Sequence, residues 1–99
     1  MSLNITSEIT TRDGFVLPTS YGRVAVYDSP NGINLNSEVN IYKDEAAFEA
    51  GDKPVKVKLV RSNQEPYDRD VDGVDILDLA HDRIMDTLSA QGVRSEKNL

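Results

Sequence analysis

One segment of the chain, residues 75–88, has a two-sided pattern that constrains the fold more than any other feature. Four aspartates recur there at spacings of three, four and four residues: Asp75, Asp78, Asp82 and Asp86. Four apolar residues repeat these spacings two positions later: Leu77, Ala80, Ile84 and Leu88. At about 100° per residue, the two sets lie on opposite sides of one helix. We therefore predict a helix over residues 74–91 that ends at Gly92 and packs its apolar side on a core.

Alternating apolar and polar residues predict strands in four other segments. These segments are residues 3–11, 23–28, 33–43 and 55–60. We place the first at a sheet edge, and the last alternates most regularly. The turn residues at 29–32 join the second and third segments into a hairpin. Asp44 is expected to cap a short helix that ends at Gly51, with Phe48 as its anchor to the core.

These elements predict an α+β domain, an antiparallel sheet of four or five strands with a C-terminal amphipathic helix packed on one face. The domain covers residues 1–92, with an exposed polar loop at 62–73, and residues 93–99 form a flexible tail. The sheet is expected to contribute these side chains to the core: Val24, Val26, Val39, Ile41, Val55, Val57 and Leu59. A chain of 99 residues builds only a modest core, which favours stabilisation by assembly.

Charge is distributed unevenly along the chain. The net charge is −6, and residues 64–99 carry nine acidic and four basic residues, a net −5. This excess of acid argues against nonspecific binding to nucleic acids or membranes, which needs clustered Lys and Arg. The absence of cysteine excludes disulfides, Cys-based zinc sites and thiol chemistry.

Two charged surfaces are candidates for interaction. The four aspartates of residues 75–88 form either a solvated helix face or a docking surface for a basic neighbour. Lys56 and Lys58 share one face of the predicted strand 55–60, where they either discourage edge-to-edge aggregation or meet the acidic helix of another copy. Tyr21, Tyr27 and Tyr42, expected on the outer sheet face, are candidate anchors because aromatics dominate interface energetics.

A cation site is a weaker candidate. Asp68, Asp70, Asp72 and Gly73 open like a calcium-binding EF-hand loop, but Leu79 stands where the bidentate Glu is required. The alternative is an acidic turn that favours the N-terminus of the following helix through its dipole. His81, the single histidine, lies near the edge of the apolar stripe and is interpreted as a packing residue.

Residues 21–60 follow a recognisable layout. A strand, a Pro-Asn-Gly turn and a long strand ending in VNIY are followed by KDEAAFEAGDKPV and a final strand. This layout resembles small β-rich structural proteins of tailed bacteriophages, of the tail, baseplate or neck kind. The resemblance implies that the later helix packs back on the sheet. It carries no catalytic motif and therefore assigns no site residue.

Together these features predict a structural or interaction subunit of a larger assembly, a virion component built in the host cytoplasm. Its partners would be other protein subunits, in a homo- or hetero-oligomer, with no nucleic acid, membrane, small-molecule substrate or cofactor. We expect no enzymatic activity. Two alternatives remain: a small acidic accessory protein of the cytoplasm that binds one partner, and a cation-binding module that uses the 68–73 loop.

Overall fold

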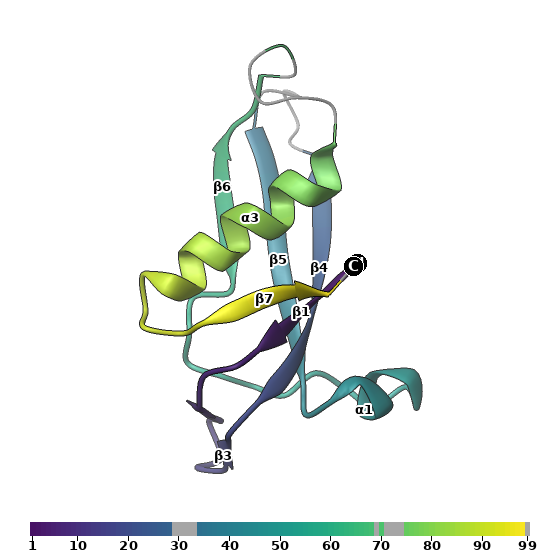
Figure 1. Ribbon diagram of the computed structural model, residues 1–99, viewed down its shortest axis with the longest axis vertical. Helices are drawn as coiled ribbons and strands as arrows, with labels where there is room; N and C mark the ends of the chain where they lie inside the picture. The colour runs from purple at the N-terminus through teal and green to yellow at the C-terminus, as the bar shows by residue number, and fades with distance from the viewer. Residues whose placement is uncertain (29–33, 69, 71–74, 99) are drawn as a thin grey trace.

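The computed structural model describes residues 1–28, 34–68, 70 and 75–98. Seven strands and two helices are defined within these residues (Figure 1). In chain order they are β1 (Ser2–Ile5), β2 (Ile9–Thr10), β3 (Val16–Leu17), β4 (Ser20–Asp28), β5 (Asn34–Tyr42), α1 (Glu45–Glu49), β6 (Ser62–Pro66), α3 (Ile76–Ser89) and β7 (Ser95–Asn98).

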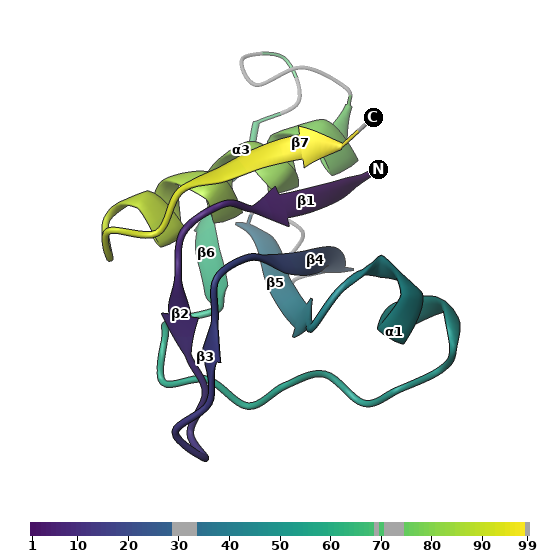
Figure 2. The same cartoon turned by 60° about the horizontal axis from the view of Figure 1, so that its bottom comes forward.

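Five strands form one antiparallel sheet in the order β6-β5-β4-β1-β7, and α3 packs on it. The α+β class and the antiparallel sheet are therefore confirmed. The two remaining strands, β2 and β3, pair as a separate hairpin that projects from one end of the sheet (Figure 2). The helix is not the C-terminal element, because β7 follows it.

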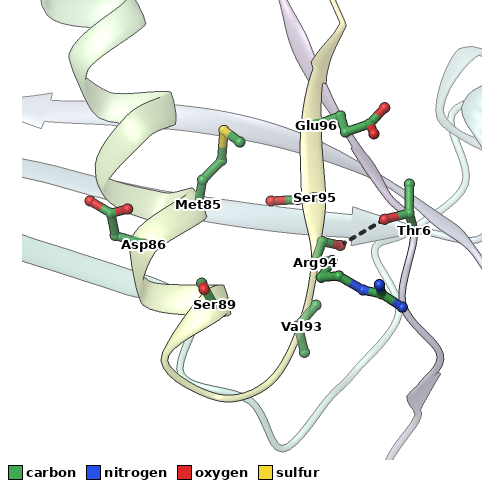
Figure 3. A pocket seen from close by; sticks show the side chains of 8 residues that line it. All are labelled: Thr6, Met85, Asp86, Ser89, Val93, Arg94, Ser95 and Glu96. Carbon is green, nitrogen blue, oxygen red and sulfur yellow. Dashed lines mark hydrogen bonds between the residues drawn. The ribbon is translucent and has the colours of Figure 1, made fainter.

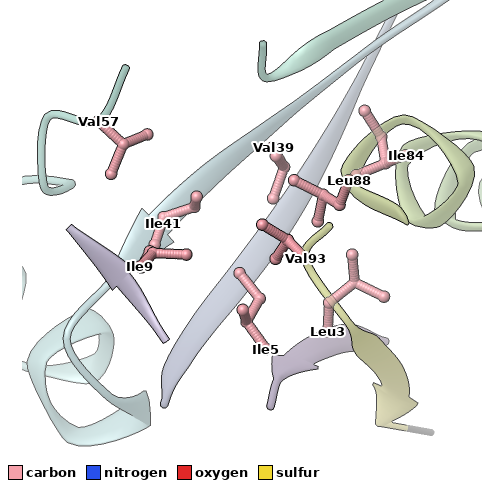
Figure 4. Packing of buried hydrophobic residues seen from close by; sticks show 9 residues of the cluster. All are labelled: Leu3, Ile5, Ile9, Val39, Ile41, Val57, Ile84, Leu88 and Val93. Atoms are coloured by element: carbon pink, nitrogen blue, oxygen red, sulfur yellow. The ribbon is translucent and has the colours of Figure 1, made fainter. Parts of the chain in front are cut away.

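The core lies between the sheet and α3. In the β4–β5 pair, Val24 stands opposite Val39 and Gly22 opposite Ile41, so these positions share the face toward α3. Ile84 and Leu88 point from the helix toward this face (Figure 4). The buried apolar cluster is Leu3, Ile5, Ile9, Val39, Ile41, Val57, Ile84, Leu88 and Val93.

The predicted helix is present, but it is less clearly two-sided than its sequence indicates. Asp75 caps its N-terminus by accepting a hydrogen bond from the Asp78 N–H at 3.0 Å, and Gly92 follows its end with φ 79°. Ala80, Ile84 and Leu88 are buried as predicted, whereas Leu77 remains 45% exposed. His81 and Arg83 are buried in its place, so the inward face is partly polar.

The strand predicted at residues 55–60 was wrong. Only Val57 forms a bridge, with Thr11, and the ladder beside β5 is made instead by β6, within the segment predicted as a loop. Val57 is nevertheless buried, and Val55 and Leu59 pack against the core. The alternation therefore reported burial correctly, because an irregular segment can also turn every second side chain inward.

Both chain ends are placed differently from the prediction. Instead of an edge strand over 3–11, β1 lies inside the sheet between β4 and β7, and the chain then turns into β2. The predicted flexible tail contains β7, which pairs with β1 over all four of its residues. Val93 enters the core just before it. Strand β7 thus belongs to the same sheet as the strands before it.

Gly22 is required by packing rather than by a turn. It lies inside β4, where a Cβ would come within 3.0 Å of Val39 Cγ2 and 3.5 Å of Leu3 Cβ. The strand predicted at 23–28 therefore begins earlier than expected, at Ser20, and runs through this glycine. The missing side chain lets β1, β4 and β5 close over the core.

Gly22→Ala is expected to lower the free energy of unfolding by about 1–3 kcal/mol, because the added methyl group overpacks the core. Ser62→Thr adds a methyl group at an exposed strand position and is the matched control. Urea unfolding of both variants measures the difference. Equal stability of the two would show that the core accommodates a side chain at Gly22.

Candidate interaction surfaces

The acidic stripe of α3 is largely occupied by contacts within the chain. Lys97, from β7, lies 2.6 Å from both Asp78 Oδ1 and Asp82 Oδ1. The Asp75 carboxylate caps the helix N-terminus. Of the four aspartates, only Asp86 is exposed and takes part in none of these contacts among the described residues. The predicted basic neighbour of this stripe is thus, for two of its four aspartates, a residue of the same chain.

The opposite side of α3 is hydrogen-bonded to the segment around β6. Arg83 Nη2 donates to the Pro66 carbonyl at 2.9 Å, and Asn63 Nδ2 donates to Thr87 Oγ1 at 3.1 Å. Gln91 pairs its side-chain amide with both backbone groups of Val60, at 2.8 and 3.0 Å. Arg83 and Thr87 of α3 and Gln91, just beyond its end, recur every four residues, a spacing that could have indicated this contact but was not used in the sequence analysis. Because α3 is attached to both edge strands, it offers little free polar surface.

The ion pairs of Lys97 affect its protonation. The hydrogen bonds that it donates to Asp78 and then to Asp82 raise the pKa of Lys97 above its ordinary 10.5. A raised pKa in the folded state means that the ammonium stabilises the fold. This contribution is fully present below pH 10.5 and disappears as the pH rises through the folded-state pKa.

Lys97→Met is expected to lower the free energy of unfolding by about 1 kcal/mol at neutral pH, since partly exposed ion pairs contribute little each. The deficit relative to the wild type should be constant from neutral pH to 10.5 and shrink above it. Arg94→Met removes one exposed positive charge nearby and controls for net charge. Urea titrations across this pH range provide the measurement. A deficit that persists in strong alkali would contradict the assignment.

His81 is buried completely rather than at a boundary. Its Nδ1 lies 2.6 Å from the Leu77 carbonyl oxygen, one turn earlier in α3. No hydrogen-bond partner reaches Nε2 among the residues that the structure describes. Because a carbonyl oxygen only accepts hydrogen bonds, Nδ1 is the donor in this contact, and the ring packs as part of the helix–sheet contact.

The candidate cation loop lies mostly outside the described residues. Asp72 and Gly73 fall outside them, and Asp70 donates its backbone N–H to Asp68 Oδ1 at 2.9 Å, which is an Asx-type turn. Over residues 1–28, 34–68, 70 and 75–98, no group of three or more acidic or histidine side chains could hold a metal ion.

The segment that carries Lys53, Lys56 and Lys58 lies beside the β2–β3 hairpin and does not form the predicted strand. Lys56 lines a cleft of about 570 Å³ together with Lys43 and Lys53, whereas Lys58 lines a different hollow. The floor and walls of this cleft are mainly apolar: Phe15, Val16, Leu17, Pro54 and Val55. Phe15 is 70% exposed and Val16 51% exposed. We name this region the hairpin cleft.

The predicted aromatic anchors differ in accessibility. Tyr21 is buried, and the Tyr42 ring packs edge-on against Phe48 at 5.1 Å between centroids. The guanidinium carbon Cζ of Arg23 lies over the Phe48 ring, 4.7 Å from the ring centroid. Phe48 thus anchors α1 to the outer sheet face, and of the three tyrosines only Tyr27 is exposed. Phe15, which the sequence interpretation did not select, exposes the larger fraction.

A second hollow, of about 410 Å³, lies between α3 and β7 (Figure 3). Met85 and Asp86 line it from the helix, and Ser95 and Glu96 line it from the strand. Its lining mixes isolated apolar side chains with charged ones of both signs. It lacks the apolar continuity of the hairpin cleft.

This chain matches no protein-family model, no curated protein and no solved structure. Its surfaces are therefore interpreted from their own chemistry. Among the described helices, none has the length and apolar character needed to cross a membrane. The hairpin cleft is the described surface that best combines exposed apolar area with net positive charge.

Proposed function

We propose that this chain is a structural subunit of a larger assembly, and specifically a tail, baseplate or neck component of a tailed-bacteriophage virion. It works by binding other protein subunits and carries out no catalysis. It requires no cofactor and engages no nucleic acid, membrane or small-molecule substrate. The virion assignment rests on the resemblance of residues 21–60, and the assembly role rests on the surface of the molecule.

The observation that carries the assembly role is the hairpin cleft. A contiguous apolar surface rimmed by polar groups marks an interaction site, because exposed apolar area is unfavourable in water. Phe15 and Val16, in the hairpin of β2 and β3, are both more than half exposed. Lys43, Lys53 and Lys56 outnumber Asp13 around the cleft, and this net positive charge can orient a partner.

The test is to combine the purified chain with proteins encoded by its neighbouring genes and to measure the masses of the complexes by light scattering. Mass spectrometry of purified particles provides an independent readout. Stable complexes with several copies, and the chain within particles, are the expected results. A strict one-to-one complex with a single host protein would favour the accessory-protein alternative. Absence of every such complex, together with turnover of a small molecule, would overturn the proposal.

A further inference from the structure

We propose that the hairpin cleft binds the exposed apolar start of α3 from a second copy of this chain. This inference rests on the proposed function and names the contact through which copies would join. It pairs two surfaces that the monomer leaves uncovered. Each is apolar at its centre, and their charges are opposite.

The first surface is basic. Phe15, Val16, Pro54 and Val55 line the cleft together, and three lysines line it against one aspartate, Asp13. The lysine side chains at 43, 53 and 56 are all exposed, and no ion pair within residues 1–28, 34–68, 70 and 75–98 engages them. An acidic segment that carries an apolar side chain therefore fits this cleft.

The second surface is such a segment. Ile76 and Leu77, in the first turn of α3, are 38% and 45% exposed, although the helix pattern places Leu77 on the core side. Asp75 precedes them, and Asp68 and Asp70 lie in the connection that leads from β6 to this helix. All three aspartates are exposed. This is an apolar pair in acidic surroundings.

The two surfaces cannot meet within one molecule. The hairpin lies at one end of the long axis, which measures 42 Å, and the start of α3 lies toward the other end (Figure 1). Contact between them therefore joins one copy to the next head to tail. A heterologous contact of this kind leaves a free cleft at one end and a free helix start at the other, so it can propagate into a ring or a filament.

Apolar contact must provide most of the affinity. Exposed charge pairs contribute little and are screened beyond about 10 Å at moderate salt, so the lysines and aspartates mainly select orientation. The patches are small compared with stable interfaces, which indicates an association that depends strongly on concentration. Added salt should weaken it only partly.

The experiment is sedimentation of the full chain over a concentration series from about 10 μM to about 1 mM. We expect the wild type to form dimers and larger species as concentration rises. Phe15→Ser and Leu77→Gln should each remain monomeric, whereas Val60→Ser, which removes an exposed valine elsewhere, should behave like the wild type. Thermal unfolding of each variant confirms that it is folded.

Mixing the two defective variants gives the decisive result. Phe15→Ser keeps an intact helix start and Leu77→Gln keeps an intact cleft, so together they can form one productive contact. The mixture should contain dimers but nothing larger. Among the lysines, Lys56→Glu should weaken association of an otherwise unchanged chain, while Lys58→Glu, outside the cleft, should not.

A wild type that stays monomeric throughout, variants that associate normally, or a mixture that stays monomeric would each overturn this contact. The proposed function would survive any of these results if the chain still binds proteins encoded by neighbouring genes. If such binding is lost in Phe15→Ser while the wild type does not self-associate, the occupant of the cleft is a different protein and the second-copy assignment is wrong.

Discussion

A chain that ends at Gly92 is expected to lose most of its stability, although its sequence suggests that only a polar tail would be removed. The truncation deletes β7, exposes the backbone edge of β1 that pairs with it, and removes Val93 from the core. It also removes the ammonium of Lys97 that binds two aspartates of α3. Losing a buried valine alone costs about 1–3 kcal/mol, a large share of the roughly 5–15 kcal/mol that stabilises a domain.

Circular dichroism during heating measures the effect of the truncation, and a melting temperature equal to that of the full chain would restore the tail interpretation.

A point substitution tests the same strand without deleting it. Glu96 lies opposite Asn4, two residues from the hydrogen bond between Thr6 N–H and the Arg94 carbonyl, so its N–H faces β1. Glu96→Pro should therefore destabilise the fold clearly, whereas Glu96→Ala, at an exposed side chain, should not.

The elements that the sequence predicts well have a strong periodicity of their own. Strands β4 and β5 pair antiparallel as expected, and β5 alternates between buried and partly buried positions along its whole length, whereas the predicted turn at 29–32 lies outside the described residues. In α1, Asp44 accepts a hydrogen bond from the Ala47 N–H at 2.7 Å, and Gly51 follows with φ 81°. Caps and periodicity are local properties, so the residues concerned reveal them directly.

Two of the missed strands, β6 and β7, are edge strands built from polar residues, with sequences SNQEP and SEKN. Neither carries an apolar alternation, because each has one neighbour and is held by backbone pairing and by side chains of α3. Their formation depends on partners far away in the chain, β5 and β1, which a local pattern does not reveal. Because residues 55–60 alternate between apolar and polar side chains, the strand was predicted there, although β6 forms it at Ser62–Pro66.

The interaction residues show the same division. The acidic stripe was recognised from its spacing, but its partner Lys97 lies on another element, so its role as an internal contact could not be read from the helix alone. Phe15 stands in a short apolar run before Pro18, and such a run does not by itself reveal whether its side chains are exposed. Only the tertiary arrangement places it outside the core, next to lysines from another part of the chain.

The second large effect concerns the helix side of the core. Ile84→Ala and Leu88→Ala are each expected to lower the free energy of unfolding by about 2–5 kcal/mol, because both side chains are fully buried and leave cavities. Leu77→Ala, in the same sequence stripe but nearly half exposed, should cost much less. Urea unfolding of the three variants measures this order.

Asp86→Ala, at an exposed position between the two core residues, is the control and should change stability by no more than about 0.5 kcal/mol. Asp82 is less suitable as a control because it binds Lys97. Similar costs at positions 77, 84 and 88 would mean that the whole apolar stripe faces the core. The start of α3 would then be unavailable to another copy, so this series also bears on the contact with the hairpin cleft.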